Sequence, residues 1–170
     1  MDFLELSKKR YSCRKLSNKK VSNDLIDKII EAGILAPTAV NKQPFKIFKM
    51  ESEKAKDAIA QSTKFTFGAD CFLVVGYKED EAWIRSFDDK NFAAVDASIV
   101  ATHMMMEITD LGLATTWVGY FDAPLLKKLC KELEGYELIA IFPIGYESED
   151  AEPSERHFIR KNKNEIIATL

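Results

Sequence analysis

The chain has 170 residues, of which 46% are hydrophobic and 30% are charged, with a formal net charge of −3 at pH 7. This length favours one sizeable core and predicts a single domain over residues 1–170. The slight acidity gives no global electrostatic basis for binding nucleic acid, and no apolar stretch reaches the roughly 18 to 20 residues that span a bilayer.

Two further features of the sequence indicate the cellular compartment in which the protein works. Met1 leads directly into an amphipathic segment instead of a signal peptide. The three cysteines, Cys13, Cys71 and Cys130, are odd in number and widely spaced, which fits neither a disulfide framework nor a metal-binding pair. We therefore expect a cytoplasmic protein with reduced thiols and with neither nucleic acid nor membrane as a partner.

The first half of the chain alternates helical and strand patterns. Apolar residues recur at helical spacing over residues 22–35, behind Ser22 as a helix start signal, and Pro37 ends this predicted helix. Residues 45–50 alternate as a half-buried strand does, and the unbroken apolar run 71–75 suits a strand that is covered on both faces.

The second half begins with a long helical pattern. Residues 91–111 contain no Gly or Pro and carry apolar side chains all around the helical wheel, which predicts a buried central helix. Residues 113–118 and 138–144 are predicted strands, with a helix between them that starts at Asp122. This mixed order predicts an α+β fold with one sheet flanked by helices. The charged stretch 147–170 is either a solvated tail or a segment that lies across a partner surface.

Three motifs are candidates for ligand binding. Arg10, Ser12 and Arg14 point to one side of an extended segment and can converge on one anion, such as a phosphate, although a short basic run is also commonly just solvated. The loop 36–45 is bracketed by prolines and carries two amides that can pair with a heterocycle or make local turns. In the third motif, 115–121, a glycine either admits a flat ligand or ends an ordinary core strand.

The order and combination of these motifs resemble the flavin-dependent nitroreductase family. The shared pattern comprises Arg-x-Ser-x-Arg at 10–14, Ala-Pro-Thr-Ala-x-Asn-x-Gln-Pro-Phe at 36–45, Asp-Ala-Ser at 96–98, Trp-Val-Gly at 117–119, and Gly-Tyr at 145–146 before a basic tail. The match covers almost the whole chain. It implies an α+β three-layer sandwich whose central, mostly antiparallel sheet is flanked by helices. It also implies an intertwined homodimer in which residues 147–170 cross to the partner subunit.

The resemblance further implies an FMN-dependent oxidoreductase that passes hydride from NADH or NADPH through FMN to a small acceptor such as a nitroaromatic or quinone. The implied FMN-binding residues are Arg10, Ser12, Arg14, Pro37, Thr38, Ala39, Asn41, Gln43, Val118, Gly119, Gly145, Arg160 and Lys161. The family usually supplies the 36–45 loop from the other subunit, and Arg156 competes with Arg160 and Lys161 for the phosphate. No side-chain acid, base or nucleophile is implied, because the cofactor carries the redox chemistry.

Several positions depart from the family pattern. His103 replaces a usual amide and lies on one predicted helix face with Asp96 and Glu107, so a metal site is conceivable, although pairing with a carboxylate or packing at a dimer interface is more ordinary. Tyr120 stands where many relatives have a second glycine, which puts the acceptor in doubt. Cys13 is either a buried structural thiol or a low-pKa one.

Two alternative functions remain at this point. One is a non-catalytic flavin-binding module. The other is flavin fragmentation or reductive dehalogenation, whose enzymes usually carry an added lid over the flavin, whereas this chain has only a short insertion between residues 78 and 91.

Overall fold

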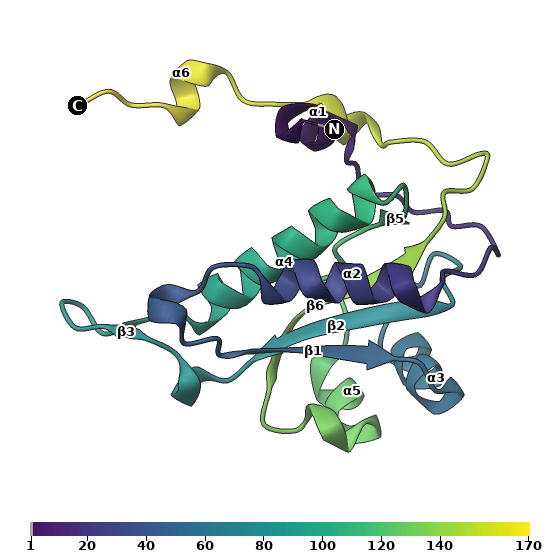
Figure 1. The fold of residues 1–170 in the computed structure, drawn as a ribbon, viewed down its shortest axis with the longest axis horizontal. Coiled ribbons are helices and arrows are strands. Elements are labelled where there is room, and N and C mark those ends of the chain that lie inside the picture. Colours follow the sequence, from purple (N-terminus) through teal and green to yellow (C-terminus); the bar gives the residue numbers. More distant parts are fainter. Residues whose placement is uncertain (1) are drawn as a thin grey trace.

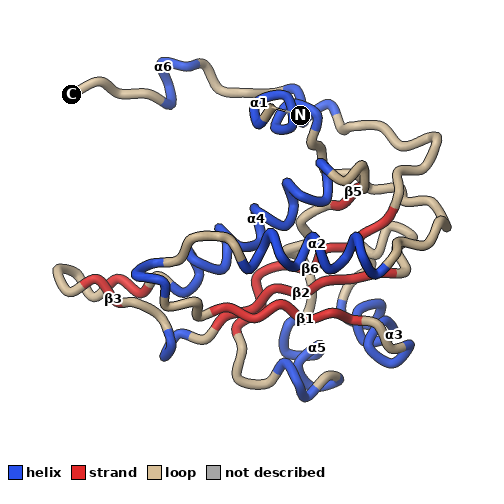
Figure 2. The backbone as a smooth tube through the Cα atoms, in the orientation of Figure 1, coloured by secondary structure: helices blue, strands red, loops and turns tan. Residues whose placement is uncertain are grey.

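The computed structural model describes residues 2–170, and its centre is a four-stranded antiparallel sheet with helices on both faces (Figures 1 and 2). The strand order is β1-β2-β6-β5. These strands are β1 (Phe45–Met50), β2 (Cys71–Tyr77), β5 (Ala114–Thr115) and β6 (Glu137–Gly145). A separate hairpin pairs β3 (Ile84–Arg85) with β4 (Lys90–Asn91).

The helices form the two outer layers. The α-helices are α1 (Phe3–Lys9), α2 (Asn23–Ile34), α3 (Glu53–Ser62), α4 (Ala93–Asp110), α5 (Ala123–Leu129) and α6 (Lys163–Ile166). Short 3-10 helices are η1 (Ala39–Asn41), η2 (Glu79–Glu81), η3 (Lys131–Leu133) and η4 (Glu155–Phe158). In Figure 1, α2 and α4 cover one face of the sheet, and α3 and α5 cover the other. The predicted three-layer α+β sandwich is therefore confirmed.

Each face of the sheet has its own core. The α2 and α4 layer packs on side chains such as Leu73 and Phe142, and the α3 and α5 layer packs on Val74 and Ile141. Successive residues of a strand point to opposite faces, so a strand covered on both sides has to be apolar at every position. The unbroken apolar run 71–75 meets this requirement, as predicted.

Helix α4 is the central helix that the sequence predicts. It contacts the sheet, α1 and α2, and its buried side chains include Val100, Met104 and Ile108. Asp122 caps α5 by accepting a hydrogen bond from the Leu125 amide at 2.9 Å, as its position predicts. Among residues 2–170, no helix combines the length and the apolar character needed to cross a membrane.

The predicted strand over 113–118 is wrong in extent, because β5 covers only Ala114–Thr115. The register itself continues: Thr115 lies opposite Ile144, and the amide and carbonyl of Val118 both bond to Ile141 at 3.0 Å. Between them, residue 116 falls opposite Pro143, which has no amide hydrogen to donate. The carbonyl of Pro143 instead accepts from the Thr115 hydroxyl at 2.7 Å, so a proline on the neighbouring strand interrupts the ladder.

The C-terminal stretch leaves the body of the fold after β6. Figure 1 shows it running past α1 and away from the sheet to the C-terminus. Its apolar side chains are exposed in the single chain, including Phe158 at 71% and Ile159 at 70%. It does not form a core of its own, as its composition predicts.

Candidate functional site

Backbone hydrogen bonds fix the segment that follows α1 to one end of the sheet. The Cys13 amide donates to the Thr115 carbonyl at 3.0 Å, and the Ser17 amide donates to the Tyr146 carbonyl at 2.8 Å. Cys13 is only 1% exposed, and its thiol donates to the Lys15 carbonyl at 3.2 Å. These contacts support the interpretation of Cys13 as a structural thiol.

This anchoring brings the N-terminal arginine motif together with the C-terminal tail. A pocket of about 240 Å³ is lined by Arg10, Ser12, Arg14, Ser154, Arg156, His157 and Arg160. The tail is held there by the Tyr11 hydroxyl, which donates to the Glu147 carboxylate, and by an edge-on contact between the Tyr11 and His157 rings at 6.2 Å. Burial, followed by the hydrogen bond to Glu147, raises the pKa of Tyr11, so the phenol keeps its proton.

The charge in this pocket is uncompensated. Within residues 2–170, none of its four guanidinium groups forms an ion pair with a carboxylate. Burial, and secondly the nearby charge of Arg160, lower the pKa of Arg10. Like charges gathered in a partly desolvated pocket are stabilised by an anion, and guanidinium groups match the geometry of phosphate oxygens. The arrangement is therefore suited to a phosphate group.

Two of the three basic tail residues that are candidates for binding the phosphate line the arginine pocket. Both Arg156 and Arg160 line it, and Lys161 follows directly but is not among the lining side chains. One guanidinium nitrogen of Arg160 donates to the carbonyls of His157 and Ile159, the latter at 2.8 Å. These backbone contacts orient the arginine in the absence of a carboxylate partner.

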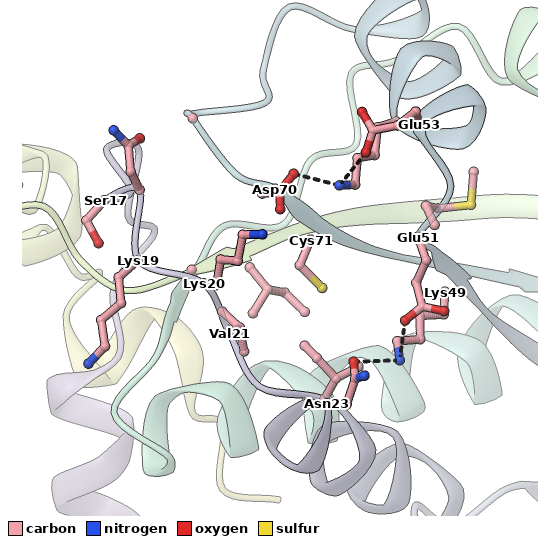
Figure 3. Close-up of a pocket in the computed structure, with 17 residues that line it drawn as sticks. Ser17, Lys19, Lys20, Val21, Asn23, Lys49, Glu51, Glu53, Asp70 and Cys71 are labelled. Atoms are coloured by element: carbon pink, nitrogen blue, oxygen red, sulfur yellow. Dashed lines mark hydrogen bonds and ion pairs between the residues drawn. The ribbon is translucent and has the colours of Figure 1, made fainter.

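A second cavity, of about 560 Å³, lies between the starts of α2 and β2 and contains several lysines (Figure 3). Two of them are already neutralised: Lys49 lies 2.6 Å from Glu51, and Lys56 lies 2.6 Å from Asp70. Burial, more than any neighbouring charge, raises the pKa of the Cys71 thiol in this cavity to about 11, so it is not a nucleophile near neutral pH. The arginine pocket is the better anion site.

Gly145 lines this second cavity and not the arginine pocket. A Cβ atom at this position would lie 3.2 Å from Leu16 Cβ. The glycine lets the N-terminal segment, which carries the arginine motif, lie close against the end of β6.

The loop with Asn41 and Gln43 lies at the opposite end of α2 from the arginine segment (Figure 1). A helix of 12 residues is about 18 Å long. The structure therefore does not bring the two amides to the arginine pocket of the same chain. Both residues have left-handed backbone conformations, with φ of 58° at Asn41 and 52° at Gln43.

Val118 and Gly119 lie at the far end of the β5 region. The Val118 side chain belongs to the core under α3 and α5, whereas Gly119 is exposed and lines a groove together with Tyr120. The Tyr120 carbonyl accepts from the Thr63 hydroxyl at 2.8 Å, while its ring is 80% exposed and meets Phe65 edge-on. An aromatic side chain is thus presented to solvent where the resemblance implies an acceptor site.

The conceivable metal site on α4 does not form. Asp96 is 1% exposed and bonds to the amide of Ala39, whereas His103 is exposed on the helix surface. Seven residues separate the two positions by about 10.5 Å along the helix axis. Within residues 2–170, no three His, Cys, Asp or Glu side chains are placed to hold a metal ion. The contact between Asp96 and Ala39 was not predicted, although a carboxylate within an apolar helical stretch is a signal for one.

Comparisons with known proteins agree with this fold. The nitroreductase family model matches residues 7–64 and 62–146. A nitroreductase family protein from Clostridium difficile 630 superposes with a TM-score of 0.91 over 100% of both chains and is 35% identical. A protein from Methanothermobacter thermautotrophicus, provisionally named NADH dehydrogenase/NAD(P)H nitroreductase, is 26% identical over 88% of this chain and 80% of its own length.

A protein from Exiguobacterium sibiricum 255-15, provisionally named a nitroreductase and solved in complex with FMN, has a TM-score of 0.85 over 100% of this chain and 98% of its own. It is 20% identical, so this likeness concerns the fold alone. Both the family match and the relative at 35% identity cover most of the chain. The chain therefore belongs to the nitroreductase family.

Proposed function

We propose that the protein binds FMN with its phosphate in the arginine pocket and is an NAD(P)H-dependent oxidoreductase for a small acceptor such as a nitroaromatic or quinone. The observation that carries this proposal is the set of four guanidinium groups around one small pocket, none of which is paired with a carboxylate within residues 2–170. The FMN complex of the Exiguobacterium protein and the NAD(P)H in the name of the Methanothermobacter relative support it. When bound, FMN supplies the chemistry of accepting a hydride from the nicotinamide and passing it to the acceptor.

The residues present fit an elongated ligand with a phosphate at one end. The hydrogen bond from the Cys13 amide attaches the arginine segment to Thr115. From Thr115, the chain runs along β6 to the exposed Gly119. Residues 115–118 keep the register of an extended strand, so Thr115 and Val118 are about 10 Å apart, and Gly119 follows Val118 directly. The chain thus offers cations at one end and an exposed glycine beside an aromatic ring at the other.

The role of the protein in this reaction is binding, orientation and electrostatic tuning. Arginines remain protonated at all physiological pH values, so they bind anions and do not transfer protons. A guanidinium beside the pyrimidine edge of the flavin, which we assign to Arg14, stabilises negative charge there. We propose no catalytic acid, base or nucleophile. The proposed FMN contacts are Arg10, Ser12, Arg14, Pro37, Thr38, Ala39, Asn41, Gln43, Val118, Gly119, Gly145, Arg160 and Lys161.

We further propose that residues 1–170 form one domain of a homodimer in the cytoplasm, in which the extension 147–170 crosses to the partner after it has passed the arginine pocket of its own chain, and the 36–45 loop serves the partner's flavin. Three observations support this arrangement. The loop lies far from the arginine pocket of its own chain, and the apolar side chains of the tail are exposed. Helix α4 also exposes a strip that includes Val95, Ile99 and His103, which suits a helix that packs on a second copy.

A mixed-dimer experiment tests the shared site. Arg10→Ala damages the phosphate end, and a chain with both Asn41→Ala and Gln43→Ala damages the loop, so each homodimer has two damaged sites. In a dimer of one chain of each kind, a shared site leaves one of the two sites intact. We expect mixing and refolding to restore FMN binding. Unrestored binding in verified mixed dimers contradicts the sharing, since sites within one chain would all stay damaged.

Turnover distinguishes an enzyme from a non-catalytic flavin-binding module. We expect anaerobic NADH or NADPH to bleach the flavin absorbance, and a quinone or nitroaromatic to restore it. Binding without bleaching by either nucleotide favours the module. The segment between β2 and α4 holds only η2 and the short β3–β4 hairpin, so a large lid of the kind associated with flavin fragmentation or dehalogenation is not present in residues 78–91. Recovery of intact FMN after many turnovers tests against fragmentation.

A further inference from the structure

Asp96 of helix α4 has a buried carboxylate whose two oxygens differ in their contacts. The residue is 1% exposed. Its Oδ1 atom accepts a hydrogen bond from the Ala39 amide at 2.9 Å, whereas its Oδ2 atom is buried without a hydrogen-bond partner among residues 2–170. The contact joins the central helix to a loop 57 residues away in the sequence.

The loop that Asp96 contacts has an unfavourable backbone. Val40, Asn41 and Gln43 have φ values of 45°, 58° and 52°, in the left-handed region that residues other than glycine avoid. Val40 is the least suited of the three, because its side chain is β-branched. Such conformations persist only where surrounding contacts determine them.

Most of the other contacts of this loop are local. The Gln43 amide donates to the Thr38 hydroxyl at 3.2 Å, and the Gln43 side chain donates to the Asn41 carbonyl at 3.2 Å. These bonds shape the loop but do not attach it to the rest of the fold. The bond from Ala39 to Asp96 attaches the start of η1 to α4, directly before the strained residues.

Stability alone does not explain a carboxylate at this position. A buried carboxylate oxygen without a donor costs folding free energy, and an apolar side chain would avoid that cost. Incompletely satisfied buried polar groups are found preferentially at functional sites. The cost is consistent with a residue that is kept for the conformation it imposes on the loop.

We propose that Asp96 is a positioning residue that holds residues 38–43 in the conformation in which Asn41 and Gln43 meet the flavin. This inference rests on the proposed function. Asp96 acts through the Ala39 amide and does not itself touch the flavin. The amides at positions 41 and 43 are thereby presented before FMN binds, which reduces the entropy lost on binding.

Two substitutions of Asp96 separate the hydrogen bond from the charge. Asp96→Ala removes the carboxylate that accepts from the Ala39 amide. We expect the affinity for FMN to fall by about tenfold or more, which is the effect expected from the loss of one charge-assisted hydrogen bond. Asp96→Asn keeps an oxygen that accepts from Ala39, and we expect its affinity to stay within about threefold of the wild type. Equal losses in both variants overturn the proposal.

Val100→Ala is the matched control for damage to α4. Val100 is buried on the same helix, four residues after Asp96, and does not contact the loop through a hydrogen bond. We expect it to lower the Tm while FMN affinity stays within about threefold. If Asp96→Ala and Val100→Ala weaken FMN binding equally at equal losses of Tm, the role of Asp96 is merely structural and the proposal is wrong.

A double-mutant cycle with Asn41→Ala tests whether Asp96 acts through the loop. We expect the double variant to lose less FMN affinity than the product of the two single-variant losses, because both changes remove the same contact. Independent losses overturn the proposal. Amide hydrogen exchange without FMN gives a second readout: protection at Ala39 should disappear in Asp96→Ala, and retained protection overturns it as well. A wild type that binds no FMN defeats the proposed function instead, and the exchange result still decides the conformational role of Asp96.

Discussion

Arg10→Ala should weaken FMN binding without affecting riboflavin, which has the same ring but no phosphate. Arg10 lines the pocket together with three other guanidinium groups and is partly buried there. A hydrogen bond between charged groups contributes about 1.5 to 3 kcal/mol, and each 1.4 kcal/mol is a factor of ten, so we expect FMN affinity to fall roughly 10- to 100-fold. The remaining arginines keep the loss from being complete.

The same substitution should not destabilise the protein without FMN. Burial and the neighbouring Arg160 both lower the pKa of Arg10, so its charged form is disfavoured by folding. Removing that charge relieves repulsion, and the Tm of the FMN-free variant should equal or exceed that of the wild type. The variant thus separates a residue kept for a ligand from one kept for the fold.

Fluorescence titrations of FMN and riboflavin, at low and high salt, measure the effect. The loss for FMN should shrink at high salt, because screening weakens the contact between phosphate and guanidinium. Arg85→Ala is the control, since Arg85 is already paired with Asp88 on the β3–β4 hairpin. Equal losses for FMN and riboflavin, or an unchanged FMN affinity, would refute the assignment of this pocket to the phosphate.

Three further predictions concern the fold around the site. Burial raises the pKa of Cys71 from 9.0 to about 11, so the stabilising effect of its thiol is present below pH 9 and is lost as pH rises toward 11. Urea titrations should therefore show that the difference in unfolding free energy between the wild type and Cys71→Ala falls over that range. A constant difference contradicts this prediction. Thr115→Val leaves the buried carbonyl of Pro143 without its donor and should lower the unfolding free energy by about 1 to 3 kcal/mol, so an unchanged urea midpoint would argue against the interrupted ladder. Gly33→Ala places a Cβ atom 2.9 Å from side chains of β1 and α4, and overpacking of about 1 to 3 kcal/mol should outweigh a helix-propensity gain of about 1 kcal/mol. Its Tm should therefore fall, and a rise would show that the neighbours move aside freely.

Much of the fold was predictable because its signals are local. The helix over 22–35, the strands 45–50 and 71–75 and the central helix 91–111 agree with the observed elements to within two residues at every end. Their periodicity follows from which faces are buried, so sequence spacing alone reveals it. The predicted extent of the strand 113–118 was wrong because its hydrogen-bond ladder is interrupted by Pro143 of β6, and a local sequence pattern carries no information about another strand.

The candidate site was predictable only in part. The spacing of Arg10, Ser12 and Arg14 predicts that they share one side, and they do line one pocket. Their meeting with the tail required the resemblance, because no spacing rule joins segments so far apart in the chain. The helical wheel places Asp96 and His103 on one face, but it contains neither their separation along the helix axis nor the bond from the Ala39 amide to Asp96.

The central claim is that this chain binds FMN and that a nicotinamide nucleotide reduces it. Its most direct test is one anaerobic absorbance experiment, in which purified protein is saturated with FMN, freed of excess cofactor and titrated with NADH and then NADPH. We predict about one FMN per chain and full bleaching of its visible absorbance by about one equivalent of at least one of the two nucleotides. A protein that retains no FMN, or whose bound FMN stays oxidised with both nucleotides, would contradict the claim.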